Sequence, residues 1–223
     1  GLNQSYGGSH TLWDVDVAVP AGARLCVMGR NGVGKTTLLK SLMGLLRVTS
    51  GEMRFDGHDL AQLPAHARAD LGIGYVPQGR EIFSQLTVEE NLRMGLLAKR
   101  VRPADAMERI YATFPVLGNM LRRRGGDLSG GQQQQLAIGR ALLLEPKLLI
   151  LDEPCEGIQP NIVHEIGDLI LRLNQELSLT VLLIEQKLPF ARRVGSDFMI
   201  MDKGRVVTSG AISDLRDDVV RLH

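Results

Sequence analysis

Short apolar runs alternate with longer stretches of helical periodicity over much of the chain. Residues 24–28, 148–151 and 180–184 predict strands, and the last two runs are largely apolar, as strands covered on both faces are. Residues 160–177 instead place apolar side chains on one stripe at helical spacing, and Pro160 suits the first turn of such a helix. This alternation predicts an α/β domain with a mainly parallel sheet.

Further segments continue the same pattern. They are a predicted helix at 34–46 and two short predicted strands at 52–55 and 72–76. Near the end of the chain, the runs 198–201 and 205–208 flank Lys203-Gly204, which predicts a β-hairpin with a tight turn and therefore a small antiparallel part.

The middle of the chain differs from the rest. From about Gly79 to Arg140 the helical periodicity continues without a convincing strand, which predicts a helical insertion into the α/β core. We therefore expect one domain, with a core of residues 1–78 and 141–223 and a helical subdomain of about 79–140.

Composition narrows the class of protein. The chain has 223 residues, of which 44% are hydrophobic and 23% charged, as in a soluble globular domain. The formal net charge of +1 gives no indication of nucleic acid or of an anionic membrane surface, and the run Arg122 to Arg124 predicts a solvated helix end or loop. The apolar runs are far shorter than the roughly 20 residues of a membrane-spanning helix. Cys26 and Cys155 are too few for a disulfide framework, which favours a reducing cytosol.

A phosphate-binding loop follows the first predicted strand of the core. The stretch Gly29-Arg30-Asn31-Gly32-Val33-Gly34-Lys35-Thr36 matches the pattern G-x-x-x-x-G-K-[ST] in full. Glycines let the backbone curl so that N–H groups point at the phosphates, and the following helix adds the positive end of its dipole. In such loops the lysine reaches the β- and γ-phosphates and the hydroxyl binds magnesium. The predicted nucleotide-binding residues here are Gly29, Asn31, Gly32, Gly34, Lys35, Thr36 and Thr37.

Two carboxylates follow the predicted strand 148–151. Asp152 is placed to hold magnesium, directly or through water, at the carboxyl end of the strand, where open α/β sheets bind ligands. Glu153, one residue later, is placed to polarise the attacking water. The alternative, a polar loop start, is weaker because the same chain holds a complete phosphate loop. A chance glycine-rich turn is a weak alternative for that loop too, since it follows a strand and opens a helix.

The stretch Leu128-Ser129-Gly130-Gly131-Gln132 is a further turn that opens a predicted helix, where backbone N–H groups can bind an anion. Together with the phosphate loop, Gln78 and the Asp152-Glu153 pair, in this order, it resembles the ATP-binding-cassette (ABC) ATPases over essentially the whole chain. The resemblance implies MgATP as the ligand, ATP hydrolysis as the reaction, and a P-loop α/β fold.

The resemblance also implies roles for single residues. Ser129, Gly130 and Gly131 would bind the γ-phosphate of ATP held by a second, similar subunit, so that two ATP molecules lie between two cassettes. Gln78 would sense magnesium and the γ-phosphate, and Tyr6 would stack on adenine, since its π-face suits a flat ring. Catalysis would involve Lys35, Gln78, Glu153 and Gln186, and Thr36, Gln78 and Asp152 would serve the metal. His10 and Trp13 are interpreted as structural.

Two positions depart from the family pattern. Gln186 stands where the family usually has its switch histidine; an amide can donate a hydrogen bond to the γ-phosphate but cannot carry a positive charge. Gln159 stands where the family usually has an aspartate that helps the two sites communicate. The departures put the symmetry of hydrolysis in doubt more than hydrolysis itself.

Local stretches resemble narrower groups. Ile184 to Gln186 and Tyr75 to Phe83 are similar to the ATPase subunits of branched-chain amino acid importers. Three others, Tyr6 to His10, Arg124 to Leu128 and Glu156 to Pro160, are similar to the ATP-binding subunit of urea importers. We therefore expect an importer of urea or a short amide, with amino acid import as the alternative.

The implied partners are a second cassette, alike or different, membrane permease subunits seated on the helical insertion and, indirectly, a periplasmic solute-binding protein, with no nucleic acid. The implied location is the cytoplasmic face of the membrane. Three other hypotheses stay open: a lipid exporter subunit, a soluble cassette acting on ribosomes or nucleic acid, and a regulatory cassette without hydrolysis.

Overall fold

The computed structural model describes residues 1–97 and 103–217. A six-stranded sheet forms its centre, in the order β10-β9-β3-β8-β7-β6. Its strands are β3 (Arg24–Met28), β6 (Ile73–Val76), β7 (Leu148–Asp152), β8 (Thr180–Ile184), β9 (Asp197–Asp202) and β10 (Arg205–Ala211). Five of them run parallel, and β10 is antiparallel to β9. The predicted α/β class and mainly parallel sheet are confirmed.

Two small two-stranded sheets share no strand with the central sheet. Strands β1 (Leu2–Tyr6) and β2 (Ser9–Val15) form an antiparallel pair near the N-terminus, which the sequence analysis did not predict. Strands β4 (Arg54–Phe55) and β5 (His58–Asp59) form a second pair, so only the end of the strand expected at 52–55 is a strand.

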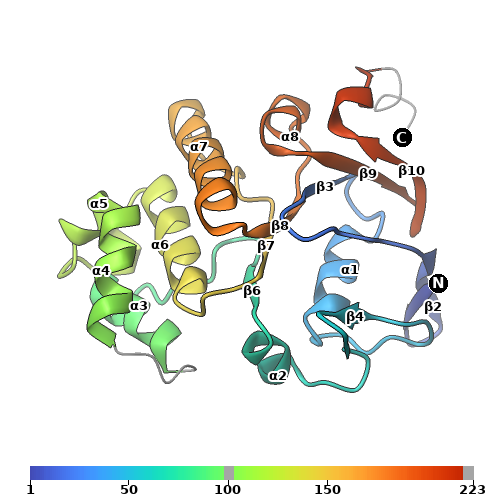
Figure 1. Cartoon of the computed structure of the whole chain (residues 1–223), viewed down its shortest axis with the longest axis horizontal. Coiled ribbons are helices and arrows are strands. Elements are labelled where there is room, and N and C mark those ends of the chain that lie inside the picture. The colour runs from blue at the N-terminus through green and yellow to red at the C-terminus, as the bar shows by residue number, and fades with distance from the viewer. Residues whose placement is uncertain (98–102, 218–223) are drawn as a thin grey trace.

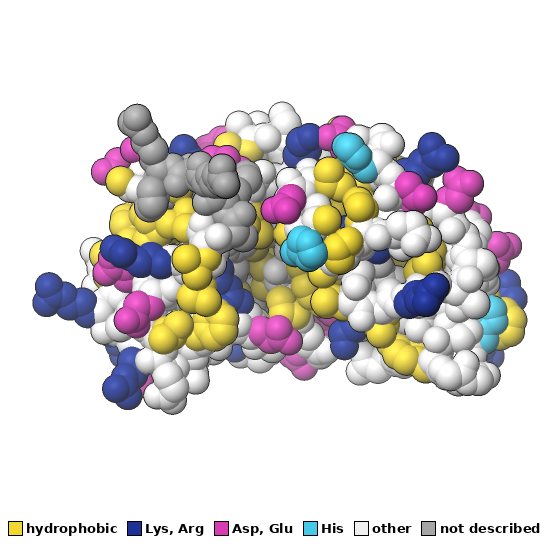
Figure 2. All heavy atoms as spheres, turned by 90° about the horizontal axis from the view of Figure 1, so that it is seen from below, with side chains coloured by type: hydrophobic (Ala, Val, Ile, Leu, Met, Phe, Trp, Pro, Cys, Tyr) yellow, Lys and Arg dark blue, Asp and Glu magenta, His cyan; other side chains and the backbone are white. Residues whose placement is uncertain are grey.

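The helices cover the sheet on both sides. They are α1 (Lys35–Leu42), α2 (Ala65–Asp70), α3 (Val88–Leu96), α4 (Pro103–Thr113), α5 (Pro115–Gly118), α6 (Gly130–Leu142), α7 (Pro160–Leu177) and α8 (Leu188–Val194). Helices α3 to α6 gather on the left of the molecule in Figure 1, beside α7, whereas α1 and the N-terminal strands lie on the right. Seen from below, hydrophobic side chains lie exposed over the middle of the molecule and over its helical side (Figure 2).

Each central strand feeds two hydrophobic cores because its side chains alternate between the faces of the sheet. In β7, Leu149 and Leu151 face the core shared with α6 and α7, whereas Ile150 faces the core shared with α1 and β2. In β8, Val181 and Leu183 face the core shared with α6 and α7, whereas Leu182 and Ile184 face the core shared with α1 and β2. Burial on both faces explains why these strands are nearly continuous apolar runs.

Helix α1 ends earlier than the sequence predicts. It stops at Leu42, and Gly44 adopts a φ of 72°, a left-handed conformation that closes helix C-termini. The buried guanidinium of Arg68 donates hydrogen bonds to the carbonyls of Ser41 and Leu42, both at 2.7 Å. It thereby satisfies the Leu42 carbonyl at the helix end and adds a second donor to the Ser41 carbonyl, which also accepts the Gly44 N–H at 3.1 Å.

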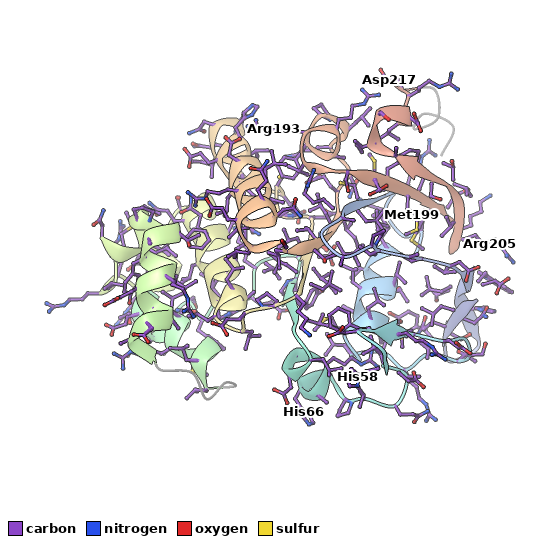
Figure 3. The ribbon with its side chains drawn as sticks, in the orientation of Figure 1. His58, His66, Arg193, Met199, Arg205 and Asp217 are labelled. Atoms are coloured by element: carbon purple, nitrogen blue, oxygen red, sulfur yellow. The ribbon has the colours of Figure 1, made fainter. Side chains whose placement is uncertain are left out.

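The β9–β10 hairpin turns at Lys203 and Gly204, as predicted. Both residues have positive φ, 46° and 77°, which suits the tight turns that join twisted strands. Just beyond this turn Arg205 lies at the right-hand edge of the molecule (Figure 3), with its guanidinium carbon 5.3 Å from the centre of the Trp13 ring. Trp13 is also stacked on His10, with ring centroids 3.6 Å apart.

Candidate functional site

The carboxyl ends of the parallel strands bring the predicted phosphate and catalytic residues to one edge of the sheet. Val27 of β3 pairs with Ile184 of β8, which also pairs with Asp152 of β7. The loops that follow these strands therefore begin side by side. This is where doubly wound sheets bind their ligands.

The phosphate loop joins β3 to α1. Lys35 begins the helix, and its Nζ donates hydrogen bonds to the carbonyl oxygens of Gly29 and Arg30, both at 2.7 Å. Burial lowers the pKa of Lys35, while the nearby carboxylates of Glu153 and Asp152 raise it in part. The lysine therefore holds the loop in its curled shape and lies where a phosphate would meet it.

The glycines of this loop are required by close backbone packing. A β-carbon at Gly29, whose φ is +138°, would lie 2.3 Å from the carbonyl oxygen of Met201. At Gly34, whose φ is +108°, it would lie 2.9 Å from the Leu12 side chain. The Gly204 N–H donates a hydrogen bond to the carbonyl of Val33 at 2.9 Å, so the turn of the β9–β10 hairpin holds the phosphate loop in place.

A cavity of about 300 Å³ opens above the loop. It is lined by Asn31, Gly32, Gly34, Lys35, Thr36, Thr37, Gln78 and Glu153. An adjacent cavity of about 400 Å³ shares Asn31, Gln78 and Glu153 with it and is otherwise lined by Glu156, Glu185, Gln186 and Lys187. The structure thus brings most of the predicted nucleotide and catalytic residues to one continuous polar cleft.

Glu153 lies at the centre of this cleft. Its Oε1 accepts a hydrogen bond from Nε2 of Gln186, which also donates to Oδ1 of Asn31 at 2.7 Å. Its Oε2 accepts a long hydrogen bond of 3.5 Å from Nε2 of Gln78. The backbone of Glu153 has a φ of 48°, which is uncommon for a residue other than glycine and recurs at functional sites.

The comparisons with known proteins agree with this geometry. The family model described as ABC transporter matches residues 12–156. The probable branched-chain amino acid transport ATP-binding protein LivF of Archaeoglobus fulgidus is 40% identical over 217 residues, which cover 96% of this chain and 91% of that protein. The high-affinity branched-chain amino acid transport ATP-binding protein BraG of Pseudomonas aeruginosa is 41% identical over 203 residues, which cover 91% of this chain and 87% of that protein. The chain belongs to the ABC transporter family.

As an ABC ATPase, the protein binds and hydrolyses ATP. Its fold is shared by solved cassettes. One, described as the ATP-binding subunit of an ABC transporter, superposes with a TM-score of 0.84 at 31% identity, covering 99% of this chain and 92% of that one. Another, the ADP conformation of an ATP-binding cassette, superposes with a TM-score of 0.86 at 25% identity. The superposition covers 99% of this chain and 96% of that one. In the parts described, no helix of this cassette is long and apolar enough to cross a bilayer.

Asp152 provides the test of whether magnesium fits the cassette. Asp152 is 2% exposed, and neither carboxylate oxygen accepts a hydrogen bond of good geometry from the described residues, although the Thr36 side chain lies close enough to lower its pKa. Burial, and then the charge of Glu153, raise the pKa of Asp152 to about 6. The Thr36 hydroxyl and the positive charge of Lys35 lower it in part. Two buried oxygens without partners are costly unless a cation or a donor approaches them.

The rest of the donor set also suits magnesium. Within residues 1–97 and 103–217, no three His, Cys, Asp or Glu side chains gather as a metal site. Mg²⁺ does not require such a group, because it is usually held by one or two protein oxygens together with substrate phosphates and water. Asp152 and the Thr36 hydroxyl supply oxygens of this kind beside the phosphate loop. The residues present therefore fit the ion, which would neutralise phosphate charge when bound.

Some predicted residues lie outside the cleft of this subunit. Ser129 caps helix α6, where its hydroxyl accepts a hydrogen bond from the Gln132 N–H at 3.3 Å. Ser129, Gly130 and Gly131 do not line either cavity described above. Tyr6 ends strand β1 and is 48% exposed, also outside both cavities. Gln159 is the N-cap of α7 and makes no side-chain capping bond.

The structure adds two site residues that the sequence analysis missed. Glu156 accepts a hydrogen bond from Nε2 of Gln78 at 3.0 Å. Glu185 is 3% exposed, and its Oε1 accepts from the backbone N–H groups of Gln186 and Lys187 at 2.8 and 2.9 Å, which fixes the loop after β8. Burial raises the pKa of Glu185. The signal was present in the sequence, because Glu185 directly follows a buried apolar strand at the same sheet edge as Glu153.

Proposed function

We propose that this cassette drives an importer of branched-chain amino acids by hydrolysing ATP at the cytoplasmic face of the membrane. The observation that carries the solute class is the pair of relatives at 40% and 41% identity, both described as branched-chain amino acid transport ATP-binding proteins. The agreement extends over nearly the whole of each chain, so it is not limited to the nucleotide motifs that all cassettes share.

In this proposal the residues of the cleft divide the work of hydrolysis. Lys35 and the loop N–H groups bind the phosphates, and Thr36, Asp152 and Gln78 serve a magnesium ion. Glu153 polarises the attacking water, and Gln186 holds Glu153 and contacts the γ-phosphate through its amide. The hydrogen bonds of Gln186 to Glu153 and to Asn31 support this role because they join the catalytic carboxylate to the phosphate loop.

The proposal further requires a second cassette. Ser129, Gly130 and Gly131 lie outside the subunit's own cleft. The Ser129 N–H is bonded to Oε1 of Gln132 at 2.9 Å, so the Ser129 hydroxyl and the N–H groups of Gly130 and Gly131 at the start of α6 would bind a phosphate held by a partner. Tyr6 is 48% exposed at the end of β1, so its ring is free for adenine to stack on. Permease subunits would dock on the helical subdomain at about 79–140, with the core of 1–78 and 141–223 holding the nucleotide. A periplasmic binding protein would deliver the solute.

Urea import is the second candidate. It is favoured by the three sequence stretches around Tyr6, Gly126 and Gly157 that resemble urea-importer subunits. The named relatives above do not support it, so amino acid import comes first.

Uptake separates the two candidates. Source cells that carry the wild type or Lys35→Ala would be given labelled leucine and labelled urea in parallel at limiting concentration. Loss of leucine uptake alone supports the proposal, and loss of urea uptake alone moves the chain to urea import. Uptake of both solutes at the wild-type rate would contradict both assignments. Glu176→Gln, a change on the exposed end of α7, serves as the control for expression.

A further inference from the structure

Three consecutive residues after Gln78 adopt a left-handed backbone. Gly79, Arg80 and Glu81 have φ values of 78°, 71° and 44°. Only the glycine adopts this conformation without cost, and non-glycine residues held in it gather at sites where the strain has a use. The turn is closed by a hydrogen bond from the Arg80 N–H to the carbonyl of Pro77 at 3.0 Å.

The Arg80 guanidinium joins two other segments of the cleft. Its Nη2 donates a hydrogen bond of 2.9 Å to the backbone carbonyl of Glu156, in the loop after β7. Its Nη1 donates a hydrogen bond of 3.2 Å to Oε1 of Gln133, in the first turns of α6. A β-carbon at Gly130 would lie 3.4 Å from Nη2, an ordinary contact distance, so the guanidinium packs against the start of α6. One side chain therefore contacts three segments.

Each of these segments carries a residue with a proposed role. The loop after β6 carries Gln78, whose amide also donates to Glu156 at 3.0 Å. The loop after β7 begins with Glu153. Helix α6 begins at the turn of Ser129, whose carbonyl accepts the Gln133 N–H at 2.9 Å. Gln133 therefore connects Arg80 to the turn proposed to bind the partner's ATP.

A second tie lies farther along the same helix. Nη2 of Arg140 donates to the carbonyl of Glu81 at 2.7 Å, and its guanidinium carbon lies 5.1 Å from the centre of the Phe83 ring. Arg140 therefore already fastens the segment after Gln78 to the body of α6. Arg80 differs from Arg140 because it contacts the loop that begins with Glu153 and also the first turns of α6. Neither contact is needed to hold the segment after Gln78 against the helix, since Arg140 already does so.

We propose that Arg80 is a positioning residue that couples the subunit's own ATP site to the Ser129 turn it presents to a partner. The inference rests on the proposed role of that turn in a second cassette. When Gln78 and the loop after Glu153 respond to bound ATP, Arg80 carries their displacement to Gln133 and so to the start of α6. Occupancy of one site thereby changes how well this subunit completes the other.

The test measures ATP hydrolysis against ATP concentration, using the chain purified through a tag together with the subunits that accompany it. We expect Arg80→Ala to lower kcat about tenfold, as loss of two charge-assisted hydrogen bonds allows, and to reduce the Hill coefficient toward one. The dissociation constant for ATP and the Tm should stay close to wild type. Arg80→Lys should recover part of kcat, because a lysine can replace one contact but not both.

Two control variants distinguish coupling between the two ATP sites from a purely structural role of Arg80. Arg122→Ala removes an exposed arginine whose side chain has no hydrogen-bond partner in the described parts of the chain, and it should change nothing. Adding Gln133→Ala to Arg80→Ala should cost little beyond the single change, since both remove the same link.

Two results would overturn the inference. One is a wild-type kcat and Hill coefficient in Arg80→Ala; the other is a loss of kcat that is matched by losses in ATP affinity and Tm. A failure of the underlying proposal would appear elsewhere, as unchanged hydrolysis when the exposed Ser129 of that turn is replaced in Ser129→Arg.

Discussion

Gly204 is the point at which the β9–β10 hairpin meets the phosphate loop. Its N–H donates to Val33 at 2.9 Å, and its carbonyl accepts the Trp13 N–H at 2.8 Å. A β-carbon at this position would lie 2.1 Å from the carbonyl oxygen of Thr11, and the φ of Gly204 is +77°. Because the group in the way is backbone, Gly204→Ala has to displace either the hairpin or strand β2.

The free energy of unfolding should fall by about 3 kcal/mol in this variant. Holding alanine in the left-handed region costs roughly 1 kcal/mol. Distorting the two backbone hydrogen bonds removes about 1 kcal/mol each. For a domain of this length the combined loss corresponds to a fall in Tm of roughly 6–12 °C. The affinity for ATP should fall too, since Val33 belongs to the phosphate loop.

Gly57 offers a matched control for the strain. It has a φ of +80° in the turn between β4 and β5, and a β-carbon there would meet nothing within 4 Å. Gly57→Ala should therefore cost only the strain, roughly 1 kcal/mol, and leave ATP binding unchanged. Calorimetric unfolding and ATP titration of both variants provide the comparison. Equal losses of Tm, with ATP affinity unchanged in both, would refute the argument that Gly204 is required by the close approach of Thr11.

Three further predictions concern the polar cleft. Glu153→Gln should lower ATP turnover by at least about a hundredfold while ATP still binds, because an amide cannot accept the proton of the attacking water; turnover at the wild-type rate would remove Glu153 from its role. Lys35→Ala should weaken ATP binding by at least about tenfold in calorimetry, since a charge-assisted contact to phosphate is lost, and wild-type affinity would contradict this. Burial raises the pKa of Asp152 to about 6, above the roughly 4 of an unfolded chain, so the free energy of unfolding contributed by this group falls as the pH rises between these values. Asp152→Asn should therefore stabilise the nucleotide-free and magnesium-free protein by roughly 2–3 kcal/mol at pH 7.5 and by almost nothing near pH 4; thermal unfolding across this range checks it, and an equal gain at both ends would be inconsistent with the cause.

The parts of the fold that were predictable are those whose cause is local. Strands β7 and β8 are buried on both faces, so their apolar runs are visible without any knowledge of their neighbours. The phosphate loop was predictable because its glycines and Lys35 are required by backbone shape and by charge within a few residues. The turn at Gly204 followed from the same kind of local rule.

The N-terminal pair β1–β2 was missed because its pattern does not alternate. Leu12 and Val15 are both buried although they stand three positions apart. Asp14 lies between them with a φ of 49°, which breaks the two-residue period that marks a strand. In β1 the two buried positions are Leu2 and the polar Gln4, so a single buried hydrophobic residue is too little to show an alternating pattern.

The contacts of Arg80 could not be predicted for a different reason. Its partners Gln133 and Glu156 are 53 and 76 positions away in sequence. Their meeting depends on how α6 lies against the loops after β6 and β7, which is a property of the assembled fold. Motif patterns indicate which residues can do chemistry, whereas the side chains that hold those residues in relation to one another emerge only from the tertiary structure.

The stack of His10, Trp13 and Arg205 has a practical consequence. Trp13 is the single tryptophan of the chain and is 39% exposed, so its emission comes from one place. Its backbone is bonded to Gly204, and Gly204 is bonded to the phosphate loop. Any change in the loop that moves the hairpin alters the distance of the indole from an imidazole and a guanidinium. The protein therefore carries an intrinsic fluorophore joined to its phosphate loop through two backbone hydrogen bonds, and we expect its emission to report ATP binding without a label.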